Sequence, residues 1–137
     1  MQGMKLPSPY DTLAGCLWLP RILAKARLFR SGGLPAEYEP RFCHPVGVDG
    51  EFLKAFGLTK DEIVSAAAGT DEEAAAWFGG RLAMERIEAW NHVARNLGRP
   101  GFPLEERLPI GKATVYAHLD TTGIETVFEV LVLDEAS

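Results

Sequence analysis

Residues 49–78, DGEFLKAFGLTKDEIVSAAAGTDEEAAAWF, decide the fold class of this chain. Thr59 and Thr70 are each followed, three positions later, by a glutamate. At this spacing the threonine hydroxyl and the glutamate carboxylate each accept a hydrogen bond from a backbone N–H group in the first helical turn. The stretch therefore predicts two short helices, at about 60–68 and 71–78.

Asp49 marks an earlier helix in the same stretch. An aspartate is a favoured N-cap residue, and Phe52, Leu53 and Phe56 follow it at helical spacing. Gly57 can then end the helix in the left-handed conformation, which a residue without Cβ adopts readily. We therefore expect a short helix that Asp49 caps.

The same kind of cap opens the chain. Residues 8–11, Ser-Pro-Tyr-Asp, combine a capping box with a proline at the first helical position, which predicts a helix that continues to Trp18. Pro20 lacks an N–H group, so we expect a kink, or a break and restart, at that point. The restarted helix should end at residues 31–33, Ser-Gly-Gly.

Further along, the longest helical pattern runs from Arg81 to Leu97, and Gly98 is placed to end it. Residues 34–48 and 98–111 are rich in proline and glycine and predict irregular loops. The first of these loops carries aromatic residues and a cysteine, which favours an ordered, packed loop over a linker.

Residues 112–133 allow two interpretations. Alternation from Ala113 to Leu119, followed by β-forming residues from Val127 to Leu133, is compatible with a terminal hairpin. Thr122 begins a fourth capping box, and apolar residues follow it at helical spacing. We prefer the helix. The expected fold is an all-α, compact multi-helix domain with proline-rich loops, with residues 1–137 as a single domain.

Composition sets the broad class. The chain has 137 residues, of which 47% are hydrophobic, so it can bury a core. We expect a cytoplasmic protein with no membrane association, since no apolar run reaches the length of a membrane span. The net charge of −5 is divided unevenly: residues 1–60 carry eight basic and five acidic side chains, and residues 61–137 carry six and fourteen. Cys16 and Cys43 are expected to be free thiols.

Residues 13–27, LAGCLWLPRILAKAR, resemble the opening of a bacterial family described as domain of unknown function 5069. Further likeness lies in a loop with Tyr38 and Cys43, in residues 49–58 and in the acid-rich cap at residues 70–73 before Trp77, and the ending at residues 133–135 is also similar. Ala24 stands where that family often has an acid, and residues 45–48 rearrange the loop. The resemblance supports the fold and implies no reaction.

The best candidate site joins the first long helix to the proline-rich loop. Arg21 and Lys25 are one helical turn apart, where a guanidinium fork and an ammonium group can hold an anion together, and aromatic side chains can form flat walls beside them. The predicted ligand-binding residues are Trp18, Arg21, Lys25, Tyr38, Cys43 and His44, with Arg27 nearby. The alternative is that these cations lie at an amphipathic edge, with their stems over Trp18 and their heads in water or paired with acids of the second half.

Catalysis is a second alternative. Cys43 and His44 are adjacent and could act as nucleophile and base with Arg21 and Lys25 as an anion clamp, although adjacent side chains in an extended chain usually point opposite ways. No third orienting group is evident. We therefore assign no catalytic residue, no metal and no cofactor, because the cysteine and histidine spacings are unlike those of zinc sites and no phosphate-binding loop is present.

The function expected from the sequence is a non-catalytic module that binds a small anion or a protein partner. Nucleic acid is an unfavoured partner, because the four basic residues at 21–30 do not share one helical face and the chain is acidic overall. A homodimer through the apolar segment 124–133 is a further alternative.

Overall fold

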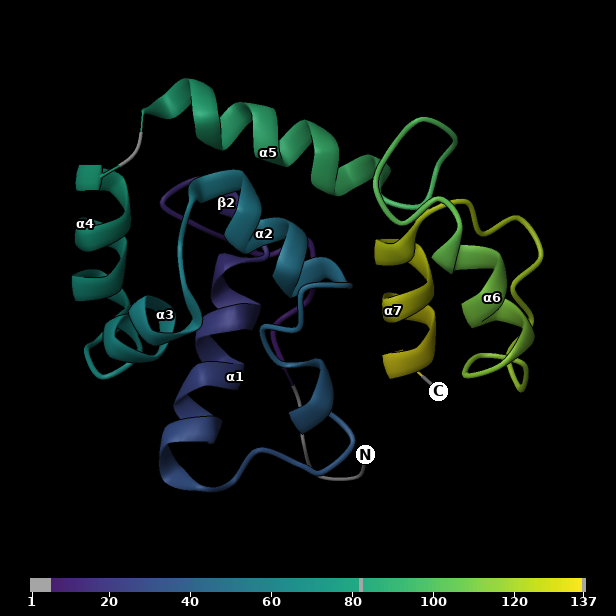
Figure 1. Cartoon of the computed structure of the whole chain (residues 1–137), viewed down its shortest axis with the longest axis horizontal. Helices are drawn as coiled ribbons and strands as arrows, with labels where there is room; N and C mark the ends of the chain where they lie inside the picture. The colour runs from purple at the N-terminus through teal and green to yellow at the C-terminus, as the bar shows by residue number, and fades with distance from the viewer. Residues whose placement is uncertain (1–5, 82, 137) are drawn as a thin grey trace. The chain divides into compact units, whose positions relative to one another are not determined.

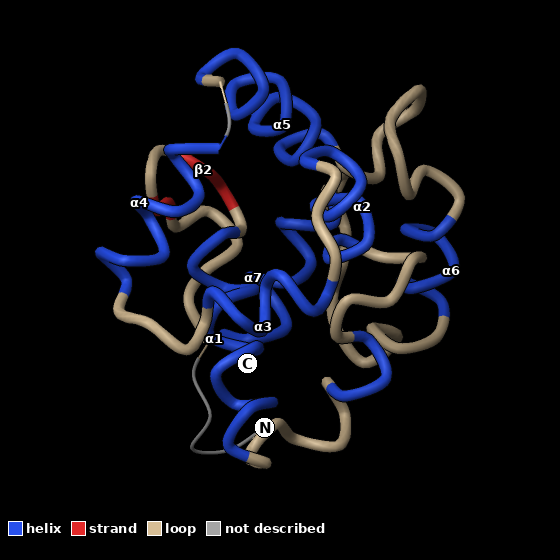
Figure 2. Tube along the Cα trace, turned by 60° about the vertical axis from the view of Figure 1, so that its left-hand side comes forward, coloured by secondary structure: helices blue, strands red, loops and turns tan. Residues whose placement is uncertain are grey.

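The chain folds as an all-α protein in the computed structural model, which describes residues 6–81 and 83–136 (Figure 1). Helices dominate the trace, and the strands are confined to one short hairpin near the N-terminus (Figure 2). The elements are β1 (Thr12–Leu13), β2 (Cys16–Leu17), α1 (Leu19–Ser31), the 3-10 helix η1 (Glu39–Arg41), α2 (Val48–Phe56), α3 (Lys60–Ala66), α4 (Asp71–Arg81), α5 (Met84–Asn96), α6 (Arg107–Ala113) and α7 (Val127–Ala136). The predicted fold class is confirmed.

Contacts within the chain define two compact units, Met1–Trp90 and Asn91–Ser137. The first unit contains the hairpin, α1 to α4 and the first half of α5. The second contains the end of α5 with α6 and α7. That residues 1–137 form a single domain stays a prediction.

The predicted N-terminal helix over residues 8–18 is wrong. Ser8 and Asp11 do exchange hydrogen bonds, but these close one turn only. The chain then reverses at Ala14 and Gly15, whose φ angles of 54° and 73° suit a tight hairpin turn, and pairs Leu13 with Cys16. The capping box does not lead to a helix here, because the reversal of the chain buries Cys16 and Leu17.

A helix does begin beside Pro20 as expected, at Leu19, although it restarts nothing, because residues 6–18 form no helix. Pro20 lies in the first turn of α1, where a missing N–H group costs no helical hydrogen bond. The helix ends as expected at Gly32, whose φ of 76° places it in the left-handed region, and the Gly33 N–H donates to the Leu28 carbonyl at 2.8 Å. The face of α1 that enters the core carries Leu19, Ile22, Leu23 and Ala26.

Helix α2 forms as predicted, but Asp49 is not its cap. The helix already begins at Val48, with Gly47 at the N-cap position, so that Asp49 lies inside the first turn and is 3% exposed. Gly57 ends the helix with φ 62°, as expected, and the Leu58 N–H donates to the Leu53 carbonyl at 3.0 Å. The side chain of Asp49 is therefore available for tertiary hydrogen bonds.

The caps at Thr59 and Thr70 are both confirmed. In each box the glutamate N–H donates to the threonine hydroxyl, at 3.2 Å from Glu62 and 3.1 Å from Glu73, and the glutamate carboxylate accepts the threonine N–H in return. Helix α4 continues to Arg81, past the glycine pair at 79–80 where we expected it to stop. Helix α5 is correspondingly shorter at its start than the predicted 81–97.

An aromatic cluster fills the core of the first unit. Phe52 of α2 lies 6.0 Å from Phe78 of α4 and 5.4 Å from Trp90 of α5 between ring centroids, and Phe56 completes the group. The Trp90 indole N–H donates to the Leu17 carbonyl at 2.8 Å, which ties α5 to the hairpin. Aromatic rings from three helices thus hold the unit together.

The second unit corrects two further predictions. Helix α6 begins inside the predicted loop 98–111 and extends two residues beyond it. Its Pro109 is the third residue, where helical N–H groups have no intrahelical acceptor. Ala113 ends α6 and residues 114–119 form turns and a bend rather than a strand, and α7 is helical, so the preferred helix is confirmed and the hairpin is wrong. Helix α7 is capped by Thr126 and not by Thr122, because Gly123 is left-handed and the Val127 N–H donates to the Leu97 carbonyl.

Replacing Gly50 by alanine should destabilise the first unit severely. A Cβ at this position in α2 would lie 2.4 Å from the carbonyl oxygens of His44 and Pro45, which are backbone atoms. We expect a loss of roughly 2–4 kcal/mol in the free energy of unfolding, measured by urea denaturation.

Gly79→Ala is the matched control. No atom lies within 4 Å of a Cβ there, and the residue is inside α4, so alanine should stabilise by about 0.5–1 kcal/mol. Equal stability of Gly50→Ala and the wild type would show that α2 does not pack on the loop as described.

Candidate functional site

The predicted site is organised around a carboxylate that sequence reasoning did not assign to it. The Asp49 side chain accepts the Trp18 indole N–H at 2.7 Å and the Cys43 backbone N–H at 2.9 Å. It also receives the Lys25 ammonium group, at 2.9 Å and 2.8 Å from its two oxygens. Both members of the ion pair are almost fully buried, with side-chain exposures of 7% and 2%. The carboxylate therefore joins α1, α2 and the proline-rich loop.

Arg21 and Lys25 both lie against the Trp18 ring. The Arg21 guanidinium carbon is 5.2 Å from the ring centroid and the Lys25 nitrogen 5.1 Å, distances at which a cation is attracted to an aromatic face. Arg21 also donates to the Pro7 carbonyl at 3.0 Å. The stems cover Trp18, as one interpretation expected, but both cations are buried, and the acid that Lys25 meets lies in the first half of the chain.

Two of the residues that donate to Asp49 have an unusual backbone. Trp18 has φ 76° and Cys43 has φ 57°, in the left-handed region that side chains with a Cβ seldom adopt. Such conformations cost on the order of 1–3 kcal/mol each and persist only where surrounding contacts hold them. Hydrogen bonds to one buried carboxylate are contacts of that kind.

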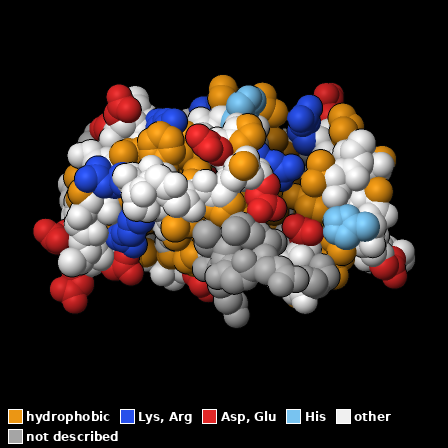
Figure 3. Space-filling model, turned by 90° about the horizontal axis from the view of Figure 1, so that it is seen from below, with side chains coloured by type: hydrophobic (Ala, Val, Ile, Leu, Met, Phe, Trp, Pro, Cys, Tyr) orange, Lys and Arg blue, Asp and Glu red, His pale blue; other side chains and the backbone are white. Residues whose placement is uncertain are grey.

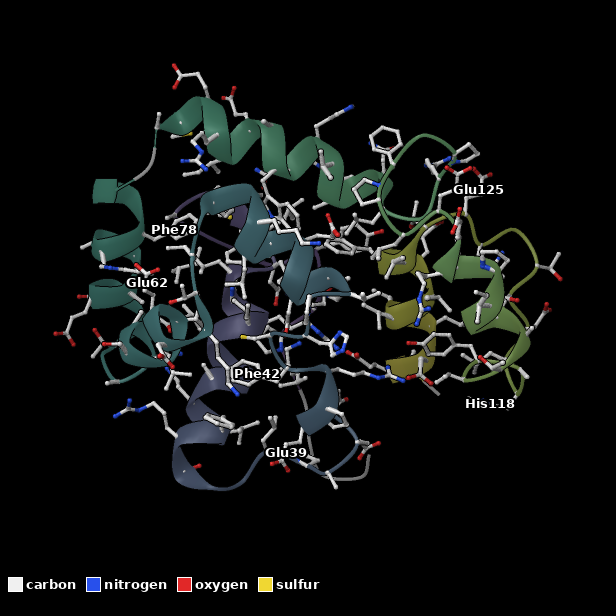
Figure 4. All side chains as sticks on the ribbon, viewed as in Figure 1. Glu39, Phe42, Glu62, Phe78, His118 and Glu125 are labelled. Carbon is white, nitrogen blue, oxygen red and sulfur yellow. The ribbon has the colours of Figure 1, made fainter. Side chains whose placement is uncertain are left out.

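Of the predicted ligand-binding residues in the proline-rich loop, only some contact the cluster around Asp49. Cys43 reaches the cluster through its backbone N–H, whereas His44 is exposed and its Nδ1 atom accepts the Val46 N–H at 3.0 Å. Tyr38 is half-buried at the start of η1. Phe42 is buried beside α1, where its ring centroid is 5.3 Å from that of Phe29 (Figure 4). The loop is thus ordered and packed, as its aromatic residues predicted.

Burial raises the pKa of the Cys43 thiol to about 12, and the charge of Asp49 adds to the effect, while Lys25 and Lys60 oppose it. The pKa of Cys16 rises to about 12 through burial alone. The nucleophilic form of a thiol is the thiolate. Neither cysteine is therefore prepared for nucleophilic chemistry near neutral pH.

Arg27 serves a different contact from its neighbours. Its guanidinium donates to Asp71 at 2.7 Å and to the carbonyls of Ala67 and Gly69, so it holds α1 against the turn between α3 and α4. Lys60, at the start of α3, lies 4.3 Å above the Phe29 ring. These cations therefore fasten α1 to α3.

An open groove lies between α3 and α4, away from the predicted cluster. Its volume is about 490 Å³, and Asp61, Glu62, Ser65, Ala66, Gly69, Glu73, Ala74 and Trp77 line it. Apart from Glu62, the half-buried and buried lining is apolar or small, and the exposed lining consists of Asp61, Ser65 and Glu73. From the sequence, these carboxylates are predicted only as part of the helix caps. Their position beside Trp77 depends on how α3 and α4 pack, which no local pattern indicates.

The described residues offer little for other kinds of site. No group of three or more His, Cys, Asp or Glu side chains among them could hold a metal ion. On the face seen in Figure 3, acidic and basic side chains are interspersed with apolar ones. Among the helices of residues 6–81 and 83–136, none has the length and apolar character needed to cross a bilayer.

Lys25→Met should destabilise the protein by roughly 3–5 kcal/mol, because it leaves the Asp49 charge buried without its partner. Lys54→Met is the control: this ammonium group is 62% exposed and 3.4 Å from Glu51, so its loss should cost less than about 0.5 kcal/mol. Chemical denaturation of both variants measures the difference. Similar small losses would contradict a structural role for the buried pair.

Cys43 should react slowly with iodoacetamide. With a pKa of about 12, the thiolate is about one molecule in ten thousand at pH 8, against about one in ten for an ordinary thiol. Mass spectrometry of the alkylated peptides should show a rate at least about 100-fold below that of the same protein in urea. An ordinary rate in the folded protein would return the catalytic interpretation to favour.

Comparison with known proteins gives a family and no activity. No curated protein and no solved structure matches the chain. The profile of the family described as Domain of unknown function (DUF5069) matches residues 4–137, and so also covers residues 79–132, where the sequence indicated no likeness. The chain therefore belongs to the DUF5069 family.

Proposed function

We propose that this domain is a non-catalytic module that binds a protein partner. Of the two ligands that the sequence allowed, a small anion is less well supported. The Lys25 ammonium group already holds Asp49 at 2.8 Å in a buried site, so an anion would have to displace an internal carboxylate. Ligand binding by Trp18, Arg21, Lys25, Tyr38, Cys43 and His44 stays a prediction.

An enzymatic role is also less well supported. Cys43 has a raised pKa, and His44 is exposed and engaged with the backbone two residues further on. A cysteine nucleophile needs a lowered pKa and a base within hydrogen-bond reach. The contacts of these two residues favour a packed loop instead.

One observation carries the proposal: the groove of about 490 Å³ between α3 and α4 presents Trp77 and small apolar residues at the surface. Its lining contains no cysteine, histidine, lysine or arginine. Aromatic side chains are enriched in protein interfaces because they offer large contact areas. A shallow surface groove of this composition suits a segment of another protein. The cytoplasmic location and the homodimer that the sequence suggested stay predictions.

Ser65→Arg tests this assignment. Ser65 is exposed and lines the groove, so an arginine there should block the groove while leaving the fold intact. Ala76→Arg is the control, because it places the same charge at an exposed position of α4 outside the groove. Immobilised wild-type protein and both variants should be compared by quantitative mass spectrometry of captured proteins, with thermal unfolding confirming their fold.

We expect Ser65→Arg to lose specific partners that the wild type and Ala76→Arg both retain. The proposal fails if both variants capture the same proteins as the wild type. It also fails if inorganic phosphate binds saturably to the wild type and Lys25→Met abolishes that binding without unfolding the protein. That second result would assign the function to the α1 cluster and to a small anion.

A further inference from the structure

We infer that the groove between α3 and α4 receives a basic segment of the partner, in which an apolar side chain is flanked by lysine or arginine. This inference rests on the proposed function and specifies the chemistry of the partner. It follows from the division of the groove into an apolar floor and an acidic rim.

The floor is formed by small residues and one large aromatic ring. Ala74 is 2% exposed, and Ala66, Gly69 and Trp77 are half-buried. Gly69 allows the close approach of α4, because a Cβ there would lie 3.1 Å from a carboxylate oxygen of Glu73. Small side chains thus keep the floor low beside Trp77. The resulting volume of about 490 Å³ has room for one or two apolar side chains.

The rim is acidic. Asp61, Glu62 and Glu73 line the groove, and Glu62, labelled in Figure 4, comes from the first turn of α3. Hydrogen bonds from the backbone and side chain of Thr70 lower the pKa of Glu73, so this exposed carboxyl group stays ionised at neutral pH and below. A cation that enters the groove therefore meets fixed negative charge on both helices.

Three basic residues near the groove make other contacts. Arg27 pairs with Asp71, which lies outside the groove lining, and Arg30 donates to the Val64 carbonyl at 3.2 Å. Lys60 lies over the Phe29 ring at 4.3 Å. Residues 60–81, which span α3 and α4, contain five acidic side chains and two basic ones, Lys60 and Arg81. The local net charge is therefore negative and complementary to a cationic segment.

The combination of floor and rim distinguishes a basic peptide from other occupants. A purely apolar segment would cover charged carboxylates without bringing a cation to them, and an acidic segment would be repelled by them. Lysine or arginine side chains can extend over the exposed rim while an apolar neighbour contacts Trp77, and a cation can also be attracted to the indole face. Because the rim is exposed, the interaction should weaken as salt is added.

The hexapeptide Lys-Lys-Leu-Leu-Lys-Lys serves as the probe. Titrated into the isotopically labelled full chain, it should shift the backbone amide signals of residues 61–77 selectively. Ser65→Arg should weaken its binding at least tenfold relative to Ala76→Arg, which carries the same added charge. The peptides Glu-Glu-Leu-Leu-Glu-Glu and Ser-Ser-Leu-Leu-Ser-Ser should bind at least tenfold more weakly to the wild type.

The inference is overturned if the signal changes are spread over the whole chain, if the two arginine variants bind the lysine peptide equally, or if either comparison peptide binds as well. Each of these results leaves the proposed function to its own test. If Ser65→Arg still loses captured partners while the lysine peptide fails to bind, the groove remains the docking site and only the basic character of the partner is wrong.

Discussion

The carboxylate of Asp49 is the interaction on which the first unit most depends. It is buried, and it accepts hydrogen bonds from the Trp18 indole, the Lys25 ammonium group and the Cys43 backbone. An ion pair removed from water gains little net free energy, but the loss of one member leaves a charge that nothing compensates. The buried carboxylate therefore fixes the relative positions of α1, α2 and the proline-rich loop, because all three have to contact it. The left-handed backbone of Trp18 and of Cys43 is held at the same point.

This arrangement changes how the basic and aromatic residues of α1 are interpreted. A tryptophan beside an arginine and a lysine has the composition of an anion site, and the same residue types also build a buried cluster around an internal carboxylate. The contacts of these residues favour the second possibility. Lys25 is paired with the Asp49 carboxylate, the pKa of Cys43 is raised, and His44 accepts a hydrogen bond from the Val46 N–H group. The surface that we propose binds a partner is the groove beside Trp77. Small residues leave room there, and the carboxylates in its lining are negatively charged.

Local capping chemistry was enough to predict most of the helices. The boxes at Thr59 and Thr70 form as expected because each needs only residues three positions apart, and both threonines are exposed. The box at Ser8 fails where the hairpin reverses the chain, and the box at Thr122 is displaced to Thr126 by a left-handed Gly123. The sequence predicts Asp49 as a cap for the same reason, because capping is the local role of an aspartate near a helix start. Its two side-chain partners, Lys25 and Trp18, are 24 and 31 positions away along the chain, so no local pattern reveals them.

Hydrogen exchange at two N–H groups tests the central role of Asp49 most directly. The Trp18 indole and the Cys43 amide both donate to this carboxylate, whereas the Trp90 indole donates to the Leu17 carbonyl. In the wild type, all three hydrogens should exchange only through large-scale unfolding. In Asp49→Asn, the Trp18 and Cys43 hydrogens should lose protection together and by more than Trp90 does. Independent exchange of Trp18 and Cys43 in the wild type, or unchanged protection in the variant, would contradict the account.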